Sequence, residues 1–221
     1  MNIKIDASNC KSIIQGYASF HNGMRDYWYY QNLTFESGKI YALISEYQQG
    51  CMYLSYLLGG NIAFEDGLAV YMDGTEIKNG DLKEISWNLE PLDEPYKNKM
   101  VRKSIERALK GSGRTEAFEQ IADKFYLTES RYDRKLKYLS GERWRATAAL
   151  GYALGKKIFY APYCPSNFYY EMGRSNMFKV FEFLSGRDCL VVLPVGSDVY
   201  LKSCVDECIY IKQEESYWDK A

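Results

Sequence analysis

The chain has 221 residues, of which 47% are hydrophobic and 26% are charged, and this composition predicts one globular domain with a sizeable core. Because 28 basic residues are balanced by 29 acidic ones, the charge argues against a nucleic-acid-binding protein. No apolar stretch approaches the roughly 20 residues of a membrane helix, and the N-terminus has no signal-peptide pattern. We therefore expect a cytoplasmic protein that meets a membrane only through a partner.

The six cysteines do not follow a metal-binding pattern. Cys204 and Cys208 are four residues apart, but the single histidine, His21, is distant from them in the sequence. We therefore expect reduced and mostly buried thiols, and no bound metal, at the positions Cys10, Cys51, Cys164, Cys189, Cys204 and Cys208.

The first ninety residues are predicted to form mostly short strands. Aromatic and β-branched residues predict strands at 13–20 and 27–35, with turn residues at 21–23 between them. One compact helix is expected at 51–58, ending at two glycines. The remaining strands of this half are predicted at 39–45, 68–72, 75–77 and 84–88.

Beyond Pro91 and Pro95 the pattern becomes mainly helical. Helices with charged faces are predicted at 96–110 and 116–126, separated by Gly-Ser-Gly, and a third is predicted at 142–154. Strands and helices then alternate, with segments at 157–161, 168–184, 189–193, 198–203 and 208–211. Such alternation predicts a parallel sheet of βαβ units, and the early hairpins predict an antiparallel layer beside it.

One segment carries a resemblance to a known family. Residues 138–145 read Tyr-Leu-Ser-Gly-Glu-Arg-Trp-Arg, which resembles the ABC ATPase signature motif, usually Leu-Ser-Gly-Gly-Glu/Gln-Arg-Gln-Arg. Residues 32–44 are similar to that family's lead-in to the phosphate loop. The resemblance implies an α/β fold with a P-loop NTPase-type core, an antiparallel β layer and a helical subdomain. It also implies one domain over 1–221, with a core at 1–90 and 137–221 and a helical subdomain at 91–136.

The phosphate loop of this family has the pattern Gly-x-x-Gly-x-Gly-Lys-Ser/Thr. Its backbone N–H groups cradle phosphates, its lysine reaches the terminal phosphates, and its hydroxyl binds Mg²⁺. In this chain only the last glycine, Gly50, remains. Cys51 takes the lysine position and Met52 the hydroxyl position.

Other catalytic groups of the family are missing as well. Ala161 and Pro162 stand where the Walker B aspartate and glutamate would support Mg²⁺ and orient water. No histidine ends the strand at 189–193. For the glutamine loop, Asn88 and Glu90 are equal candidates. Five losses at independent strands and loops predict that this chain does not hydrolyse ATP itself.

The signature segment would nevertheless be retained as Ser140, Gly141 and Glu142. In one alignment Ser140 replaces the first glycine of the motif, and in another it is the signature serine and one residue is deleted. In the family, this segment contacts ATP that is held by the other subunit of a dimer. A helix start of this kind favours an anion.

These features favour a degenerate ABC ATP-binding subunit. The resemblance implies pairing with a catalytically intact ABC ATPase and with a membrane permease, at the inner face of the cell membrane. ATP would then lie at a composite interface, with Mg²⁺ on the partner's side; a homodimer is a further alternative. An active ATPase with an unusual loop, or a scaffold that binds through Tyr27–Tyr30 and Tyr169-Tyr170, are the competing hypotheses. The transported substrate and its direction stay open.

Overall fold

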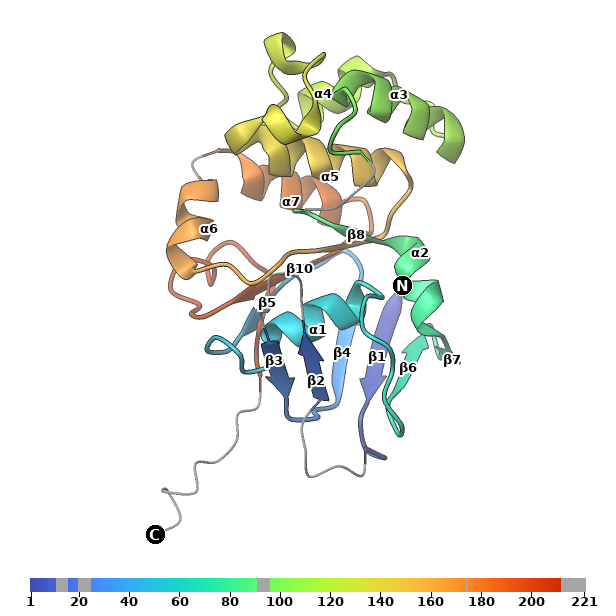
Figure 1. The fold of residues 1–221 in the computed structure, drawn as a ribbon, viewed down its shortest axis with the longest axis vertical. Coiled ribbons are helices and arrows are strands. Elements are labelled where there is room, and N and C mark those ends of the chain that lie inside the picture. Colours follow the sequence, from blue (N-terminus) through green and yellow to red (C-terminus); the bar gives the residue numbers. More distant parts are fainter. Residues whose placement is uncertain (11–15, 20–24, 91–95, 174, 212–221) are drawn as a thin grey trace.

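The computed structural model describes residues 1–10, 16–19, 25–90, 96–173 and 175–211 (Figure 1). Its centre is a five-stranded sheet in which all pairs of neighbouring strands are parallel. The strand order is β11-β5-β10-β9-β8. These strands are β5 (Ile40–Ile44), β8 (Ser86–Asn88), β9 (Ile158–Tyr160), β10 (Leu190–Val195) and β11 (Glu207–Tyr210).

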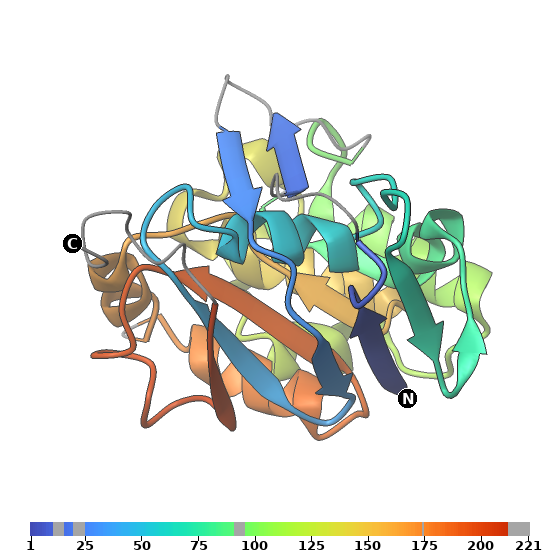
Figure 2. The same cartoon turned by 90° about the horizontal axis from the view of Figure 1, so that it is seen from below.

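A second sheet is antiparallel and has the order β4-β1-β6-β7. It consists of β1 (Asn2–Asp6), β4 (Leu33–Glu36), β6 (Ala69–Met72) and β7 (Thr75–Glu76). A separate hairpin pairs β2 (Gly16–Ser19) with β3 (Arg25–Trp28). Helix α1 (Cys51–Leu58) lies between this hairpin and the parallel sheet, as Figure 2 shows from below.

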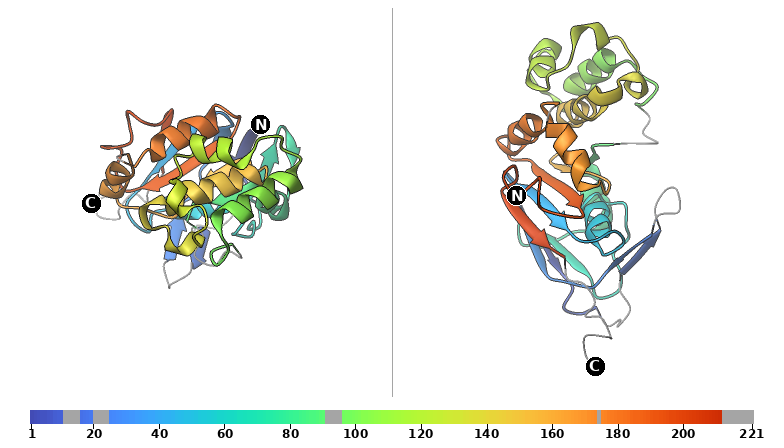
Figure 3. Two further views of the ribbon diagram at one scale, coloured as in Figure 1. Left: turned by 90° about the horizontal axis from the view of Figure 1, so that it is seen from above. Right: turned by 90° about the vertical axis from the view of Figure 1, so that its left-hand side faces the viewer.

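Helices cover the opposite face of the parallel sheet. α5 (Arg143–Ala153) and α7 (Met177–Ser185) lie nearest to it, and α3 (Val101–Ser112) and α4 (Phe118–Lys124) are stacked beyond them (Figure 3). α2 (Asn79–Ile85) leads into β8, and α6 (Ser166–Gly173) precedes α7. Three short 3₁₀ turns complete this side, η2 (Glu129–Arg131), η3 (Leu136–Tyr138) and η4 (Ser140–Glu142). Among the described residues, no helix is long and apolar enough to cross a bilayer.

The parallel sheet separates two hydrophobic cores. Because successive side chains of a strand point to opposite faces, β5 sends Ile40, Ala42 and Ile44 toward the helices. Its intervening residues, Tyr41 and Leu43, face α1 and the antiparallel sheet. All five are buried, which explains why this strand is continuously apolar rather than alternating.

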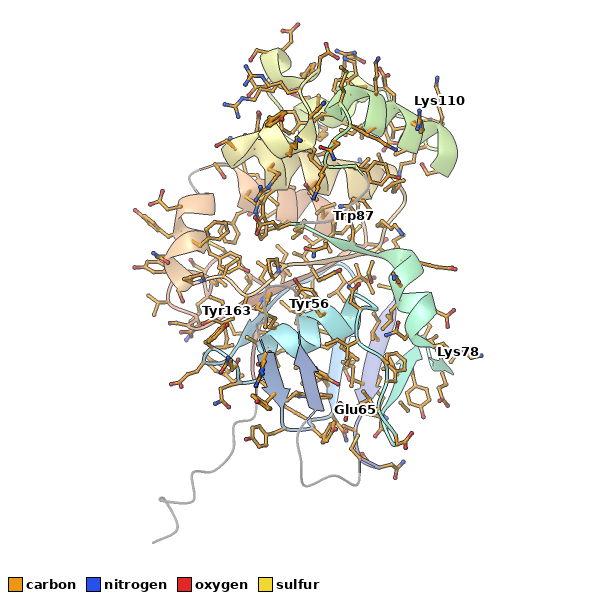
Figure 4. The ribbon with its side chains drawn as sticks, viewed as in Figure 1. Tyr56, Glu65, Lys78, Trp87, Lys110 and Tyr163 are labelled. Atoms are coloured by element: carbon orange, nitrogen blue, oxygen red, sulfur yellow. The ribbon has the colours of Figure 1, made fainter. Side chains whose placement is uncertain are left out.

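Helix α5 approaches the sheet closely at Gly151. A Cβ atom at this position would lie 2.4 Å from Cδ1 of Trp87. The Trp87 indole Nε1 donates a hydrogen bond of 2.8 Å to the backbone oxygen of Thr147, one turn earlier in α5. Figure 4 shows Trp87 between β8 and the helical layer. This contact holds α5 against β8.

Most predicted elements are found, and α1 has the predicted bounds. The predicted strand at 27–35 is instead two strands, β3 and β4, which belong to different sheets. The predicted helix at 168–184 is α6 and α7, because Asn176 adopts a left-handed φ of 63° between them. The predicted turn at 21–23 lies outside the described residues.

Two further predictions were wrong at the local level, and one helix was missed. Gly111 and Ser112 do not separate two helices but continue α3, which ends at Gly113 with a φ of 69°. Residues 198–203 form turns, in which two successive N–H groups bond to the Asp198 carbonyl. Helix α2 was not predicted; its first turn is capped by Asp81, whose Oδ2 accepts the N–H of Lys78 at 2.7 Å.

Candidate functional site

The loop at 45–50 joins β5 to α1, where the sequence predicted a degenerate phosphate loop. Gly50 adopts a φ of 99°, a left-handed conformation that glycine tolerates best. Cys51 and Met52 are buried, with 1% and 2% of their surface exposed. Burial raises the pKa of the Cys51 thiol to about 12. The two side chains at the expected lysine and hydroxyl positions therefore point into the core.

The backbone N–H groups at this helix start have partners within the chain. Gly50 N donates to Oδ1 of Asp26 at 2.8 Å, and Tyr53 N donates to Oδ2 of the same residue at 2.7 Å. Between them, Cys51 N donates to Oγ of Ser45 at 3.3 Å. Of the donors that an α-helix leaves unpaired at its start, those of Gly50, Cys51 and Tyr53 are thus bonded to side chains.

Asp26 was not among the predicted site residues. It lies on β3 and is fully buried. Burial raises the pKa of this carboxyl, and the N–H groups of Gly50, Tyr53 and Tyr27 oppose that shift because they favour the carboxylate. In the sequence Asp26 is a single acidic residue before an aromatic cluster, and no local pattern connects it with Gly50.

The end of β9 carries Ala161 and Pro162 at the predicted Walker B positions. Ala161 is fully buried, and its backbone oxygen accepts a hydrogen bond of 2.7 Å from the Ser55 hydroxyl of α1. Neighbouring Tyr163 stacks edge-on with Tyr47 of the loop, with ring centroids 5.4 Å apart; Figure 4 labels its position. This region joins the loop to the strand through neutral contacts and offers no carboxylate at those two positions.

The signature segment forms the 3₁₀ turn η4 directly before α5. Ser140 and Gly141 are exposed, whereas Glu142 is 2% exposed and points into the protein. Of the three predicted signature residues, only the first two are available to another molecule. Ser140 has a φ of 50°, in the left-handed region where glycine is preferred.

Four groups hold the Glu142 carboxylate. Oε1 accepts hydrogen bonds of 2.7 Å from both the N–H and the hydroxyl of Thr128. Arg131 approaches Oε2 at 3.2 Å, and Arg145 approaches Oε1 at 3.3 Å. This cluster connects the start of α5 to the loop that follows α4, so the signature turn and the outer helices are held together.

The two candidates for the glutamine loop have different surroundings. Glu90 forms an ion pair with Arg143, the first residue of α5. Asn88 instead accepts the N–H of Glu90 at 2.9 Å through Oδ1. Glu90 also lines an open groove of about 290 Å³ together with Ser140, Gly141, Arg143, Trp144, Phe168, Glu171, Ser175 and Met177. The fold therefore brings Glu90 and the exposed signature residues together around this groove, which the loop at 45–50 does not line.

Three other expectations concern exposure and metal binding. Tyr169 is fully buried and cannot contribute to an exposed tyrosine face, whereas Tyr170 is 53% exposed. Cys51, Cys164 and Cys189 are buried, and the other three cysteines are half-buried. In the described part of the chain, no three His, Cys, Asp or Glu side chains are grouped so that they could hold a metal ion.

No protein-family model and no curated protein matches the sequence. Solved structures do match, at low identity. An ATP-binding cassette in a post-hydrolysis state with ADP and Pi has a TM-score of 0.66 and 13% identity, covering 95% of this chain and 94% of the other. CbiO1 from Clostridium perfringens, part of the ABC transporter complex cbiONQ, has a TM-score of 0.66 and 14% identity, covering 95% and 84%.

A putative ABC transporter ATP-binding protein from Pyrococcus furiosus is similar at a TM-score of 0.63 and 12% identity, covering 96% of this chain and 98% of that protein. The resemblance that the sequence predicted is therefore confirmed at the level of the fold. It extends over nearly the whole chain, including the antiparallel sheet and the helices. The chain has the α/β fold of the ATP-binding cassettes of ABC transporters.

Proposed function

We propose that this chain is a cassette-like subunit of an ABC transporter that does not hydrolyse ATP itself. It pairs with a catalytically intact ATP-binding subunit and with a membrane permease, at the inner face of the membrane. In that pair it presents Ser140 and Gly141 to an ATP whose Mg²⁺ is bound by the partner. The solved neighbours support the transporter assignment, since one belongs to an ABC transporter complex and another is a dimeric cassette.

The observation that carries the proposal is the contrast between two helix starts. At α1, the residues do not fit a Mg²⁺–nucleotide, because Cys51 and Met52 are buried and the N–H groups of Gly50 and Tyr53 are bonded to Asp26. At α5, Ser140 and Gly141 are exposed beside an open groove. We call the loop at 45–50 the closed half of the site, because its residues do not fit a Mg²⁺–nucleotide. We call Ser140 and Gly141 the accessible half, because another molecule can reach them.

A substitution that leaves the fold intact can test the accessible half. A Cβ at Gly141 would meet no atom within 4 Å, and its φ is not positive, so Gly141→Asp fits sterically. An aspartate at a helix start stabilises the helix but repels a phosphate. We expect the ATPase rate of the assembled complex to fall at least about tenfold, with no loss of thermal stability. Ser130→Asp, on an exposed serine of η2, is the matched control.

The complex for this assay is obtained by purifying the tagged full chain in detergent from its own host. Copurification of an intact ATP-binding subunit and a permease is expected. An ATPase rate that is the same with Gly141→Asp and Ser130→Asp would contradict the composite site. Absence of both subunits would favour the scaffold alternative instead.

The closed half is tested on the isolated chain by calorimetric titration with ATP and Mg²⁺. No saturable heat is expected at millimolar nucleotide. Saturable binding that is lost on changing Gly50 would instead favour an active ATPase with an unusual loop.

A further inference from the structure

We infer that Asp26 is a built-in ligand of the phosphate loop: its carboxylate occupies the anion position at the start of α1 and thereby fastens the β2–β3 hairpin across the loop. This inference rests on the proposal that the loop holds no nucleotide of its own. It explains how the loop keeps an ordered conformation without a bound nucleotide. The anion that organises such a loop is supplied by the chain itself.

The hydrogen bonds have the pattern expected for an anion at a helix start. Each Asp26 oxygen accepts a backbone N–H of the loop–helix junction, Oδ1 from Gly50 at 2.8 Å and Oδ2 from Tyr53 at 2.7 Å. These short distances are typical of charge-assisted bonds. Gly50 is the last glycine of the phosphate-loop pattern, and Tyr53 lies in the first turn of the helix that follows, where free N–H groups favour an anion. A carboxylate that is fully buried needs such partners, because an unpaired buried charge is strongly unfavourable.

The hairpin backbone packs closely against the loop at Gly50. A Cβ atom at Gly50 would lie 3.0 Å from the carbonyl oxygen of Tyr27 and 3.2 Å from Cα of Trp28. Strand β3 therefore packs against the glycine whose N–H donates to Asp26. A phosphate group could bond to the Gly50 N–H only in place of the Asp26 carboxylate.

Aromatic packing fixes the same strand on α1. Trp28 is fully buried and stacks on Tyr53 of α1 and on Tyr30, with ring centroids 5.7 and 5.4 Å apart. The hydroxyl groups of Tyr53 and Tyr30 both donate to the carboxylate of Glu65, from the segment after α1. Figure 4 shows Glu65 on the hairpin side of the molecule. The hairpin is thus held by the hydrogen bonds of Asp26 at the loop and by an aromatic cluster beside it.

A chemical-rescue experiment on the full chain tests the inference. Asp26→Ala removes the internal anion and leaves the N–H groups without an acceptor. We expect its Tm to fall by about 5 °C or more. Inorganic pyrophosphate at about 10 mM is expected to restore at least half of that loss, because it binds the folded variant at the vacated position. The Tm of the unsubstituted protein should not respond to pyrophosphate.

Asp81→Ala is the matched control, because Asp81 also accepts a backbone N–H at a helix start, but in an exposed position. Its Tm should not be restored by pyrophosphate. Equal responses of the two variants, or stabilisation of the unsubstituted protein by pyrophosphate, would overturn the inference. Neither result would affect the composite-site proposal, which is tested at Gly141.

Should Asp26→Ala not fold, hydrogen exchange of the unsubstituted protein decides the question. The amides of Gly50 and Tyr53 are expected to exchange as slowly as those in the centre of α1, with or without pyrophosphate. Exchange at the rate of an open surface loop, or protection that develops only with pyrophosphate, would show that Asp26 does not fill the position.

Discussion

The buried carboxylate of Glu142 provides the sharpest test of how the signature turn is held. Glu142→Ala removes an acceptor for two hydrogen bonds from Thr128 and a counter-ion for Arg131 and Arg145. Removing one partner of a buried ion pair typically costs about 3–5 kcal/mol. The Arg131 side chain is 38% exposed and can be hydrated, so its contribution is discounted, whereas that of Arg145 is 13% exposed. We therefore expect a loss of about 3–4 kcal/mol in the free energy of unfolding.

Urea denaturation at neutral pH, followed by circular dichroism, measures this loss. For a domain of this size it corresponds to a fall in Tm of about 10 °C. Glu142→Gln keeps an oxygen for Thr128 but loses the charge, so an intermediate loss of about 1–2 kcal/mol is expected. A double-mutant cycle between Glu142 and Arg145 should give a coupling energy of about 1–3 kcal/mol.

The control is an ion pair whose charged atoms lie closer together but whose side chains are more exposed to solvent. Arg102 and Glu119 approach to 2.8 Å, and the Glu119 side chain is 66% exposed. Glu119→Ala should cost less than about 1 kcal/mol. If Glu142→Ala cost no more than this control, burial would not be the source of the stabilisation, and the reasoning would be refuted.

Three further substitutions and one chemical treatment test other features of the structure. Ser140→Gly should stabilise the protein by about 0.5–1 kcal/mol, since it relieves a left-handed φ of 50°; a loss of stability on urea denaturation would contradict this. Gly151→Ala should destabilise the protein by about 1–2 kcal/mol because the added Cβ would overlap Trp87. Gly111→Ala, whose Cβ would have no atom within 4 Å, should stabilise it by about 0.5–1 kcal/mol. If both substitutions shifted the Tm in the same direction, the close-contact argument would be refuted. Iodoacetamide at about pH 8 should label the native protein only at the half-buried thiols, Cys10, Cys204 and Cys208. Burial raises the pKa of three thiols to about 11 or 12 and keeps them protonated, so peptide mapping should find label only after denaturation at Cys51, Cys164 and Cys189.

Local patterns were sufficient for the elements that build the core. The apolar run at 51–58 followed by Gly59 predicted α1 with its observed bounds, and the apolar run within 39–45 predicted a strand of buried type. The signature segment was recognisable because its polar residues are adjacent in the sequence. Each of these signals depends on neighbours only a few positions away.

The missed features depend on contacts between distant residues. Asp26 and Gly50 are on different elements, so only the folded chain shows that one carboxylate satisfies the loop. Similarly, no pattern around Glu142 shows that its side chain points inward to Thr128 rather than outward with Ser140. Burial and long-range hydrogen bonding decide both cases.

The strand order of the parallel sheet also determines when the chain can finish folding. Strand β5 ends at Ile44, but its two neighbours, β10 and β11, begin only at Leu190 and Glu207. During synthesis, the apolar strand β5 therefore has no partner in this sheet until residues beyond Leu190 have left the ribosome. Contacts so far apart in sequence form slowly, and an unpaired apolar strand is prone to associate with other chains. A product that stops before Leu190 would therefore present two open edges of β5, and we expect premature termination to yield aggregated chains rather than a partly folded soluble protein.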